Sequence, residues 1–126
     1  MAILGLGTDI AEIGRFETGR LSRRFLGSVF TEGERGYCLS RPCPEQHLAA
    51  RFAAKEAAAK ALSCLGEFVS VCQVEVIREP DGRPSLSLRP GRHGEAAPRL
   101  PQNARLHLSL SHADHYAVAT VIVESA

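Results

Sequence analysis

The chain has 126 residues, a formal net charge of +1 and four cysteines. This length allows one domain with a modest core. The small net charge gives no whole-molecule field for nucleic acid, and no apolar run approaches the roughly 18 residues that span a membrane. The N-terminus lacks the basic start and long apolar core of a signal peptide. We therefore expect a single domain over residues 1–126, no nucleic acid, no membrane, a cytoplasmic location and reduced thiols.

The first part of the chain predicts a short strand followed by helices. Residues 2–6 are apolar and are interrupted by glycine, which indicates a buried strand ending at Asp9. Apolar residues spaced three apart then predict a first helix to about Thr18, capped by Thr8 or Asp9. The segment Thr31-Glu-Gly-Glu34 has the pattern of a capping box and predicts a short helix of about eight residues.

A long helix, predicted from about residue 45 to residue 62 or 65, carries charge beside its apolar face. At about 100° per residue, Leu48, Phe52 and Ala59 form one stripe, and Glu56 and Lys60 fall on its flank. One interpretation is a helix-stabilising salt bridge between positions four apart, worth about 0.2–0.5 kcal/mol. The other is that these two charges serve a function, because an unpaired charge beside a buried face is costly.

The second half of the chain predicts strands. Residues 72–77 alternate with a period of two, Pro80-Asp-Gly-Arg-Pro84 predicts a turn, and residues 85–89 predict a returning strand. Residues 89–103 are rich in proline and glycine and allow at most a brief helix. The last 20 or so residues predict a hairpin whose leucines share one face with His112. With helices early and strands late, the fold class is α+β.

Asp9, Glu56, Lys60 and His112 are the candidates for chemistry. Two carboxylates, a lysine and a histidine without cysteine ligands suit Mg²⁺ bound together with a substrate phosphate, with the lysine on phosphate oxygens. The structural alternatives are a helix cap for Asp9 and a core histidine for His112. Serine-hydrolase chemistry is disfavoured, because Ser111 lies within a predicted strand without a nucleophile-elbow sequence.

Several blocks of the sequence resemble the small 4′-phosphopantetheinyl transferases, most closely the short bacterial holo-[acyl-carrier-protein] synthases. The blocks, in order between Leu4 and Glu124, are Gly5-Leu-Gly-Thr-Asp-Ile10, Phe30-Thr-Glu-Gly-Glu34, Arg51-Phe-Ala-Ala-Lys-Glu-Ala-Ala-Ala-Lys-Ala61 and Leu108-Ser-Leu-Ser-His112. The resemblance implies an antiparallel sheet packed on a long helix. It implies transfer of the 4′-phosphopantetheine arm of coenzyme A to a serine of apo acyl carrier protein. Adenosine 3′,5′-bisphosphate is released, and the reaction supports fatty acid biosynthesis.

The resemblance also implies roles for individual residues. Asp9 and Glu56 match the Mg²⁺ ligands, and Lys60 matches the lysine near the transferring phosphate. His112 matches the histidine of the coenzyme A site, to which we also assign Arg51 and Ser111. The general base for the serine hydroxyl is either Glu56 or Lys60 acting as a neutral amine; the sequence leaves this choice open.

The family further implies a partner and an assembly. Acyl carrier proteins are acidic, so a basic cluster near the N-terminus becomes a docking surface; it consists of Arg15, Arg20, Arg23 and Arg24. The short enzymes are trimers with sites between subunits. By analogy with longer, fused relatives, His112 of one subunit is expected to face Asp9 and Glu56 of its neighbour.

One segment departs from the family pattern. Relatives commonly read Lys-Ala-x-Gly-Thr-Gly after the long helix, whereas this chain reads Lys60-Ala-Leu-Ser-Cys-Leu-Gly66. The departure puts the coenzyme A contacts of this loop in doubt. Two alternatives remain, a non-catalytic trimeric binding domain of the same fold and another Mg²⁺-dependent phosphate-transfer enzyme. The commonest form of the second needs a Gly-x-x-x-x-Gly-Lys-Ser/Thr loop, which is absent.

Overall fold

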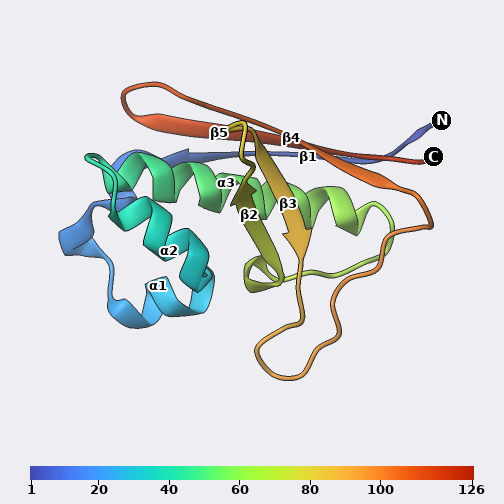
Figure 1. Cartoon of the computed structure of the whole chain (residues 1–126), viewed down its shortest axis with the longest axis horizontal. Coiled ribbons are helices and arrows are strands. Elements are labelled where there is room, and N and C mark those ends of the chain that lie inside the picture. Colours follow the sequence, from blue (N-terminus) through green and yellow to red (C-terminus); the bar gives the residue numbers. More distant parts are fainter.

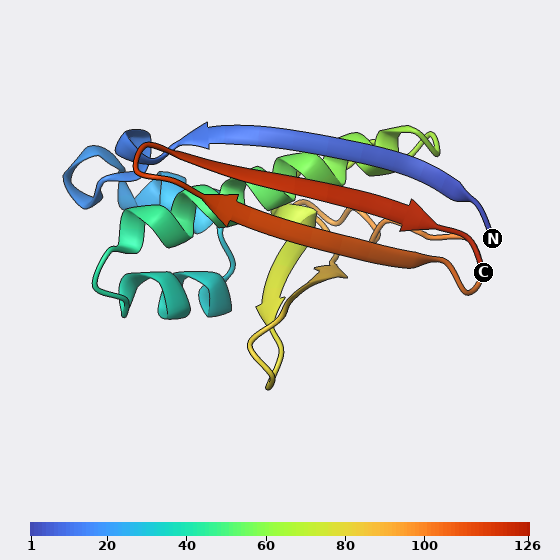
Figure 2. The same cartoon turned by 90° about the horizontal axis from the view of Figure 1, so that it is seen from above.

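The computed structural model describes all residues from 1 to 126 and shows a sheet with one long helix against it (Figures 1 and 2). The sheet is antiparallel, in the order β1-β5-β4, and is formed by β1 (Ile3–Glu12), β4 (Arg105–His112) and β5 (Tyr116–Glu124). The helices are α1 (Arg23–Val29), α2 (Glu32–Leu39) and α3 (Pro44–Ser63), and a separate hairpin is formed by β2 (Val74–Arg78) and β3 (Pro84–Leu88). None of the helices combines the length and apolar character needed for a membrane span.

Helix α3 fills the centre of the molecule and is buried on nearly all sides. Seven of its alanines are buried: Ala49, Ala50, Ala53, Ala54, Ala57, Ala58 and Ala61. The prediction of one apolar stripe is therefore wrong, since Phe52 and Ala59 are only partly buried while residues all around the helix are enclosed. Alanine makes this possible because its small side chain lets the sheet and the other helices approach the helix backbone from several directions.

Strand β1 contacts α3 backbone to backbone. A Cβ added to Gly7 would lie 2.0 Å from the carbonyl oxygen of Ala57, and one added to Gly5 would lie 2.1 Å from that of Ala61. Only glycine permits such an approach. Because side chains alternate along a strand, Asp9 follows the two glycines on the face turned toward α3.

The prediction of a first helix after Asp9 is wrong. Strand β1 continues to Glu12, and two short 3₁₀ turns follow, Ile13–Phe16 and Thr18–Arg20. The three-residue spacing of Ile13 and Phe16 fits these turns, in which residues i and i+3 lie on the same side, and both side chains are buried. The α1 helix was not predicted from the sequence; it begins at the N-cap Ser22, whose side chain accepts from the backbone N–H of Phe25.

The other predicted elements are confirmed with small changes in their bounds. Thr31 Oγ1 accepts from the backbone N–H of Glu34 at 3.2 Å, and the carboxylate of Glu34 accepts from the backbone N–H of Thr31 at 2.8 Å. This is the predicted capping box at the start of α2. The two hairpins and α3 lie where they were predicted, and the α+β architecture is confirmed.

The two ends of the chain lie side by side (Figures 1 and 2). The backbone N–H of Ala2 donates to the Ser125 hydroxyl at 2.8 Å, and the backbone N–H of Ser125 donates to the carbonyl of Ala2 at 2.8 Å. The edge strand β1, which carries Asp9, is paired only with the last strand of the chain.

Candidate active site

Asp9 and Lys60 meet where β1 crosses α3. The Lys60 ammonium donates to Asp9 Oδ1 and to the carbonyl oxygen of Thr8, both at 3.0 Å. The Asp9 side chain is 19% exposed and that of Lys60 is 55% exposed. Asp9 therefore does not cap a helix, and the ion pair of Lys60 is formed with Asp9 instead of with Glu56. The two fixed hydrogen bonds hold a positive charge at the edge of the β1–α3 contact.

Glu56 lies one helical turn before Lys60 and is only partly buried. Positions four apart on a helix are neighbours on one side of it, so Glu56 lies on the same side of α3 as the Lys60–Asp9 pair. Its carboxylate forms no salt bridge. A partly buried carboxylate without a partner, on the side of the helix that also carries the Lys60–Asp9 pair, is an arrangement that a cation stabilises.

The chemistry of these donors decides which cation fits. No group of three or more histidine, cysteine, aspartate or glutamate side chains is placed to hold a metal ion. A structural zinc site, which needs four protein ligands, is therefore absent. Two carboxylates fit Mg²⁺, which usually keeps several waters and takes its remaining oxygens from substrate phosphates.

His112 ends β4 on the same face of the sheet as Asp9 but two strands away. His112 is aligned with Ala117 of β5, whereas Asp9 is aligned with Ala119 of that strand. Two strand spacings amount to about 10 Å. His112 is exposed, so it is not a core histidine. Ser111, its neighbour, points to the opposite face of the sheet. Within one chain, the side chains of Ser111 and His112 therefore do not lie together.

A cluster of cations surrounds Tyr37 close to His112. The guanidinium carbons of Arg51, Arg41 and Arg78 lie 4.3, 4.5 and 5.8 Å from the centre of the Tyr37 ring. None of the three arginines forms a salt bridge, and the Nε atoms of Arg41 and Arg51 are buried without a hydrogen-bond partner. Clustered guanidinium groups without an anion, two of them with buried and unpartnered Nε atoms, favour binding of one, and phosphate suits their geometry.

His47 connects this Tyr37 cluster to the end of β4. Its ring lies 5.6 Å from that of Tyr37. Burial lowers the pKa of His47, and the neighbouring charges of Arg51, Arg41 and His112 lower it further. Of the residues predicted for the coenzyme A site, Lys60, Arg51, Ser111 and His112, only Arg51 and His112 lie near this cluster. The residues that sequence reasoning missed are Tyr37, Arg41, His47 and Arg78; their clustering depends on the tertiary fold.

Comparisons with known proteins show the family to which the chain belongs. The family model of the 4′-phosphopantetheinyl transferase superfamily matches residues 5–121. The chain belongs to this superfamily. It is 40% identical over 125 residues to the holo-[acyl-carrier-protein] synthase of Protochlamydia amoebophila, covering 97% of this chain and 98% of that protein. It is 45% identical over 130 residues to that of Shewanella frigidimarina, covering 99% and 100%.

A solved structure of the superfamily shows the same fold. The holo-[acyl-carrier-protein] synthase of Bacillus anthracis, in complex with CoA (3′,5′-ADP), has a TM-score of 0.75, 32% sequence identity and 98% coverage of both chains. The expected family, the α+β fold and the assignment as a phosphopantetheinyl transferase are confirmed. The matches extend over the segments that carry Asp9, Glu56 and Lys60.

The predicted basic surface of this transferase surrounds an apolar hollow. All four arginines, Arg15, Arg20, Arg23 and Arg24, are exposed. Arg15 and Arg20 line a cavity of about 270 Å³ whose other walls are Phe16, Leu21, Phe25 and Phe52. Arg20 is held in place by a 3.1 Å hydrogen bond to the carbonyl oxygen of Gly14. The structure thus adds an apolar floor that the sequence analysis did not include.

The turn after α3 is the segment that departs from the family pattern. The Ser63 hydroxyl donates to the carbonyl oxygen of Lys60 at 2.6 Å, so this hydroxyl is engaged by its own helix. Gly66 has a positive φ of 83°, a conformation that glycine adopts without strain. The helix ends at Ser63, and the backbone N–H of Gly66 donates to the carbonyl oxygen of Ser63 at 3.0 Å in the turn that follows.

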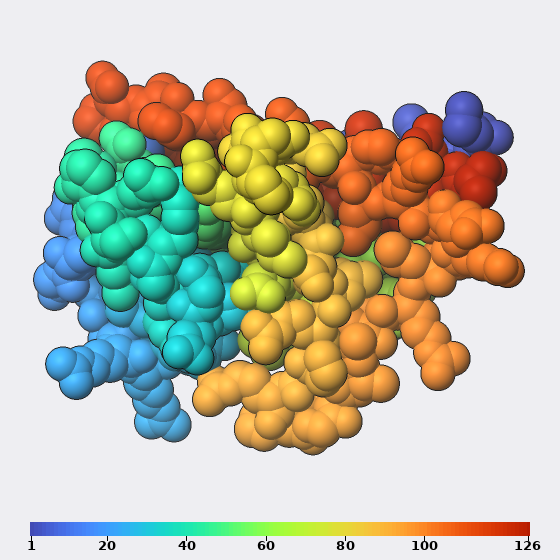
Figure 3. Space-filling model, viewed as in Figure 1, coloured from blue at the N-terminus to red at the C-terminus, as the bar shows by residue number.

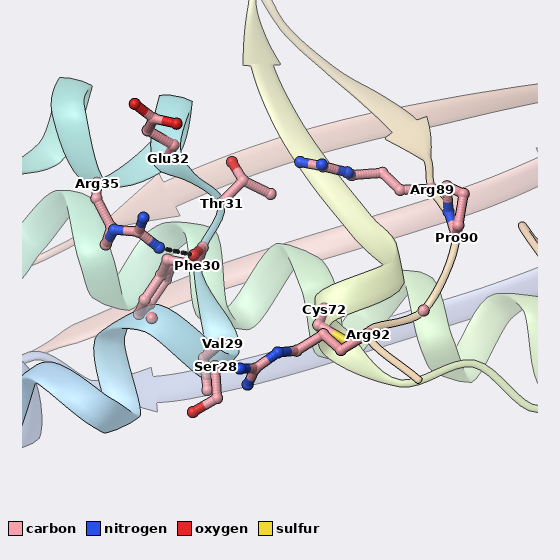
Figure 4. A pocket seen from close by; sticks show the side chains of 12 residues that line it. Ser28, Val29, Phe30, Thr31, Glu32, Arg35, Cys72, Arg89, Pro90 and Arg92 are labelled. Atoms are coloured by element: carbon pink, nitrogen blue, oxygen red, sulfur yellow. Dashed lines mark hydrogen bonds between the residues drawn. The ribbon is translucent and has the colours of Figure 1, made fainter. Parts of the chain in front are cut away.

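A second cavity, of about 420 Å³, lies on the face shown in Figure 3, between the α1–α2 turn and the segment after β3. Figure 4 shows Arg35, Arg89, Arg92 and Cys72 around it. Arg35 donates to the carbonyl oxygen of Phe30 at 2.5 Å, and Arg89 lies 3.6 Å from a carboxylate oxygen of Glu75. None of the predicted site residues lines this cavity. It is separate from the contact between Asp9 and Lys60.

Proposed function

We propose that the chain transfers the 4′-phosphopantetheine arm of coenzyme A to a serine of apo acyl carrier protein. The reaction releases adenosine 3′,5′-bisphosphate, depends on Mg²⁺ and serves fatty acid biosynthesis. The observation that carries the proposal is the ion pair of Asp9 and Lys60 at the β1–α3 contact, with the unpaired Glu56 one helical turn before Lys60. It is supported by 40–45% identity, over nearly the whole chain, to proteins named holo-[acyl-carrier-protein] synthase.

The residues at this contact divide the chemistry among them. Asp9 and Glu56 would hold the Mg²⁺ ion, which supplies positive charge on the pyrophosphate oxygens of coenzyme A when it is bound. Lys60 adds a second positive charge, preorganised by its two hydrogen bonds, where negative charge builds up in the transition state. Glu56 is the better base for the carrier serine, because Lys60 is already donating to two oxygens as an ammonium.

The Tyr37 cluster supplies the second half of the coenzyme A site. Arg41, Arg51 and Arg78 offer cationic groups for the phosphates that do not react, and the nearby His112 offers a ring N–H donor. The solved relative from Bacillus anthracis is in complex with coenzyme A. Bound in this way, the cofactor would lie between the cluster of one chain and the Asp9–Glu56 edge of another.

A homotrimer with sites between subunits, as the family resemblance implies, is also part of the proposal, and the same arrangement supports sites that two chains share. His112 and Asp9 lie two strands apart within one chain. On the face of the sheet turned away from α3, β1 and β5 expose the apolar side chains of Leu6, Ile10, Tyr116 and Val118. An apolar face of this kind marks a protein interface, and a second copy of the chain is the occupant that brings a neighbouring His112 to the site.

The surface of the four N-terminal arginines suits the acidic carrier protein. Exposed guanidinium groups around an apolar floor match an acidic amphipathic helix, whose apolar side chains enter the hollow beside Phe25 and Phe52. The positive charge of the arginines attracts the acidic partner as it approaches and fixes the position in which it binds.

Incubation with apo acyl carrier protein, coenzyme A and Mg²⁺ tests the proposal. Mass spectrometry of the carrier should show the gain of one phosphopantetheine, which EDTA abolishes. Glu56→Gln and Asp9→Asn should each lose the transfer by about 100-fold or more, while Glu32→Gln, an exposed carboxylate of α2, should retain it. Full transfer by Glu56→Gln would contradict the mechanism, and binding of the carrier without any transfer would favour the non-catalytic domain.

A further inference from the structure

We propose that the buried ion pair between Lys55 and Glu34 positions the active site by fixing the rotation of α3 about its own axis. Lys55 directly precedes Glu56, the proposed metal ligand. The inference rests on the proposed function, and Lys55 acts here as a positioning residue that touches neither substrate nor metal.

The pair lies entirely inside the protein and joins three elements. The ammonium of Lys55 lies 2.5 Å from Glu34 Oε1, and both side chains have no exposed surface. The same carboxylate accepts from the backbone N–H of Thr31 at 2.8 Å and from that of Val76 at 2.7 Å. One carboxylate therefore ties the start of α2, strand β2 and helix α3 to a single point.

Stability alone does not account for such a pair. Replacing a buried ion pair by packed apolar side chains of similar volume is often neutral or stabilising, because desolvation offsets the attraction between the charges. The pair does fix the orientation of the helix that carries Lys55, because a charged hydrogen bond forms only over a narrow range of distances and angles. A leucine in place of Lys55 would fill the space without fixing an orientation.

Helix α3 has particular need of a fixed orientation. It rests on β1 through glycine and alanine, with backbone approaching backbone at Gly5–Ala61 and Gly7–Ala57. Helices usually lock together by inserting ridges of side chains into grooves, and this contact has hardly any ridges. The contact sets the distance between strand and helix, while the rotation of the helix is set from its other side, where Lys55 is anchored.

A small rotation is enough to spoil the site. Side chains reach about 6 Å from a helix axis, so a turn of about 10° moves the Glu56 carboxylate by about 1 Å relative to Asp9. Functional groups must be held within about 0.5 Å of their productive geometry. The anchor at Glu34 therefore controls whether Asp9 and Glu56 can share one ion.

The test measures metal affinity directly in the full chain. Mn²⁺, a stand-in that also prefers oxygen ligands, is titrated with coenzyme A present, and the free ion is followed by electron paramagnetic resonance. The double variant Glu34→Gln/Lys55→Met leaves no buried charge unpaired and is expected to fold. Its Kd for Mn²⁺ should rise tenfold or more, the range seen when outer-shell partners of metal ligands are lost.

Two further variants separate positioning from stability. Val121→Ala truncates a buried side chain of the sheet and should lower the melting temperature while keeping the wild-type Kd. Asp9→Asn should abolish binding. An unchanged Kd in the double variant, with binding lost in Asp9→Asn, would overturn the positioning role alone. Failure of the wild-type chain to bind Mn²⁺ would overturn the proposed metal site and this inference together.

Discussion

Replacement of Gly7 by alanine tests the backbone contact on which the active site is built. The new Cβ would lie 2.0 Å from the carbonyl oxygen of Ala57 and 2.8 Å from the backbone nitrogen of Ala61. Ordinary contact begins at about 3.4 Å, so strand and helix would have to separate by more than 1 Å. Neither partner is a flexible side chain, so no rotamer change relieves the clash.

The cost follows from this separation. Overpacking a core typically costs about 1–3 kcal/mol and occasionally more; because both clashing groups are backbone, we expect at least 3 kcal/mol. For a chain of this size that lowers the melting temperature by about 10 °C. Asp9 lies two residues further along the same strand, so the folded fraction of Gly7→Ala should also transfer phosphopantetheine at least tenfold more slowly.

Urea unfolding gives the free energy of unfolding, and mass spectrometry of the carrier protein gives the transfer rate of the folded enzyme. Gly36→Ala is the matched control. A Cβ at Gly36 meets nothing within 4 Å, and in the α2 helix the change should stabilise the protein by up to about 1 kcal/mol. A Gly7→Ala protein with wild-type stability and rate would refute the view that β1 and α3 meet through their backbones.

Three further predictions concern other parts of the molecule. Arg20→Glu should raise the KM for acyl carrier protein about tenfold at low salt and leave that for coenzyme A unchanged; equal effects on both would argue against a docking surface. Arg51→Met should raise the KM for coenzyme A and leave that for acyl carrier protein unchanged. A lost charged hydrogen bond costs about 1.5–3 kcal/mol, which corresponds to a rise in KM of roughly ten- to a hundredfold. Burial raises the pKa of the Cys38 thiol from 9.0 to about 11, so the unfolded chain loses this proton first. The free energy of unfolding should then fall between pH 9 and 11 by up to about 1.4 kcal/mol per pH unit; a Cys38→Ala variant should lack this slope in urea titrations.

Local patterns predicted the elements that local interactions determine. The capping box at Thr31–Glu34, the long alanine helix and the C-terminal hairpin all depend on residues within a few positions of one another. The helix predicted after Asp9 failed because Ile10, Ile13 and Phe16 have a spacing that suits a helix. In the structure Ile10 lies on the outer face of a strand, and the other two lie in a 3₁₀ turn.

The candidate site was predictable only in part. Asp9, Glu56 and Lys60 could be recognised from their residue types and sequence context, yet the only ion pair considered for Lys60 was the one with Glu56. A salt bridge four residues apart is visible in the sequence, whereas the bond to Asp9 joins residues 51 positions apart. The burial of Lys55 was missed for the same reason, because its partner Glu34 is 21 residues away.

The pairing of the first strand with the last has a consequence for how the chain folds. The register joins Ile3 to Glu124 and Asp9 to Ala119, so this pairing closes a loop that contains nearly the whole chain. Contacts between such distant residues slow folding, because the entropy of closing the loop is lost before the contact is gained. Joining the adjacent termini by a short linker and opening the chain at the Asp81–Gly82 turn would make β5 and β1 a local hairpin. Such a permuted chain should fold faster, with the strand that carries Asp9 in place early.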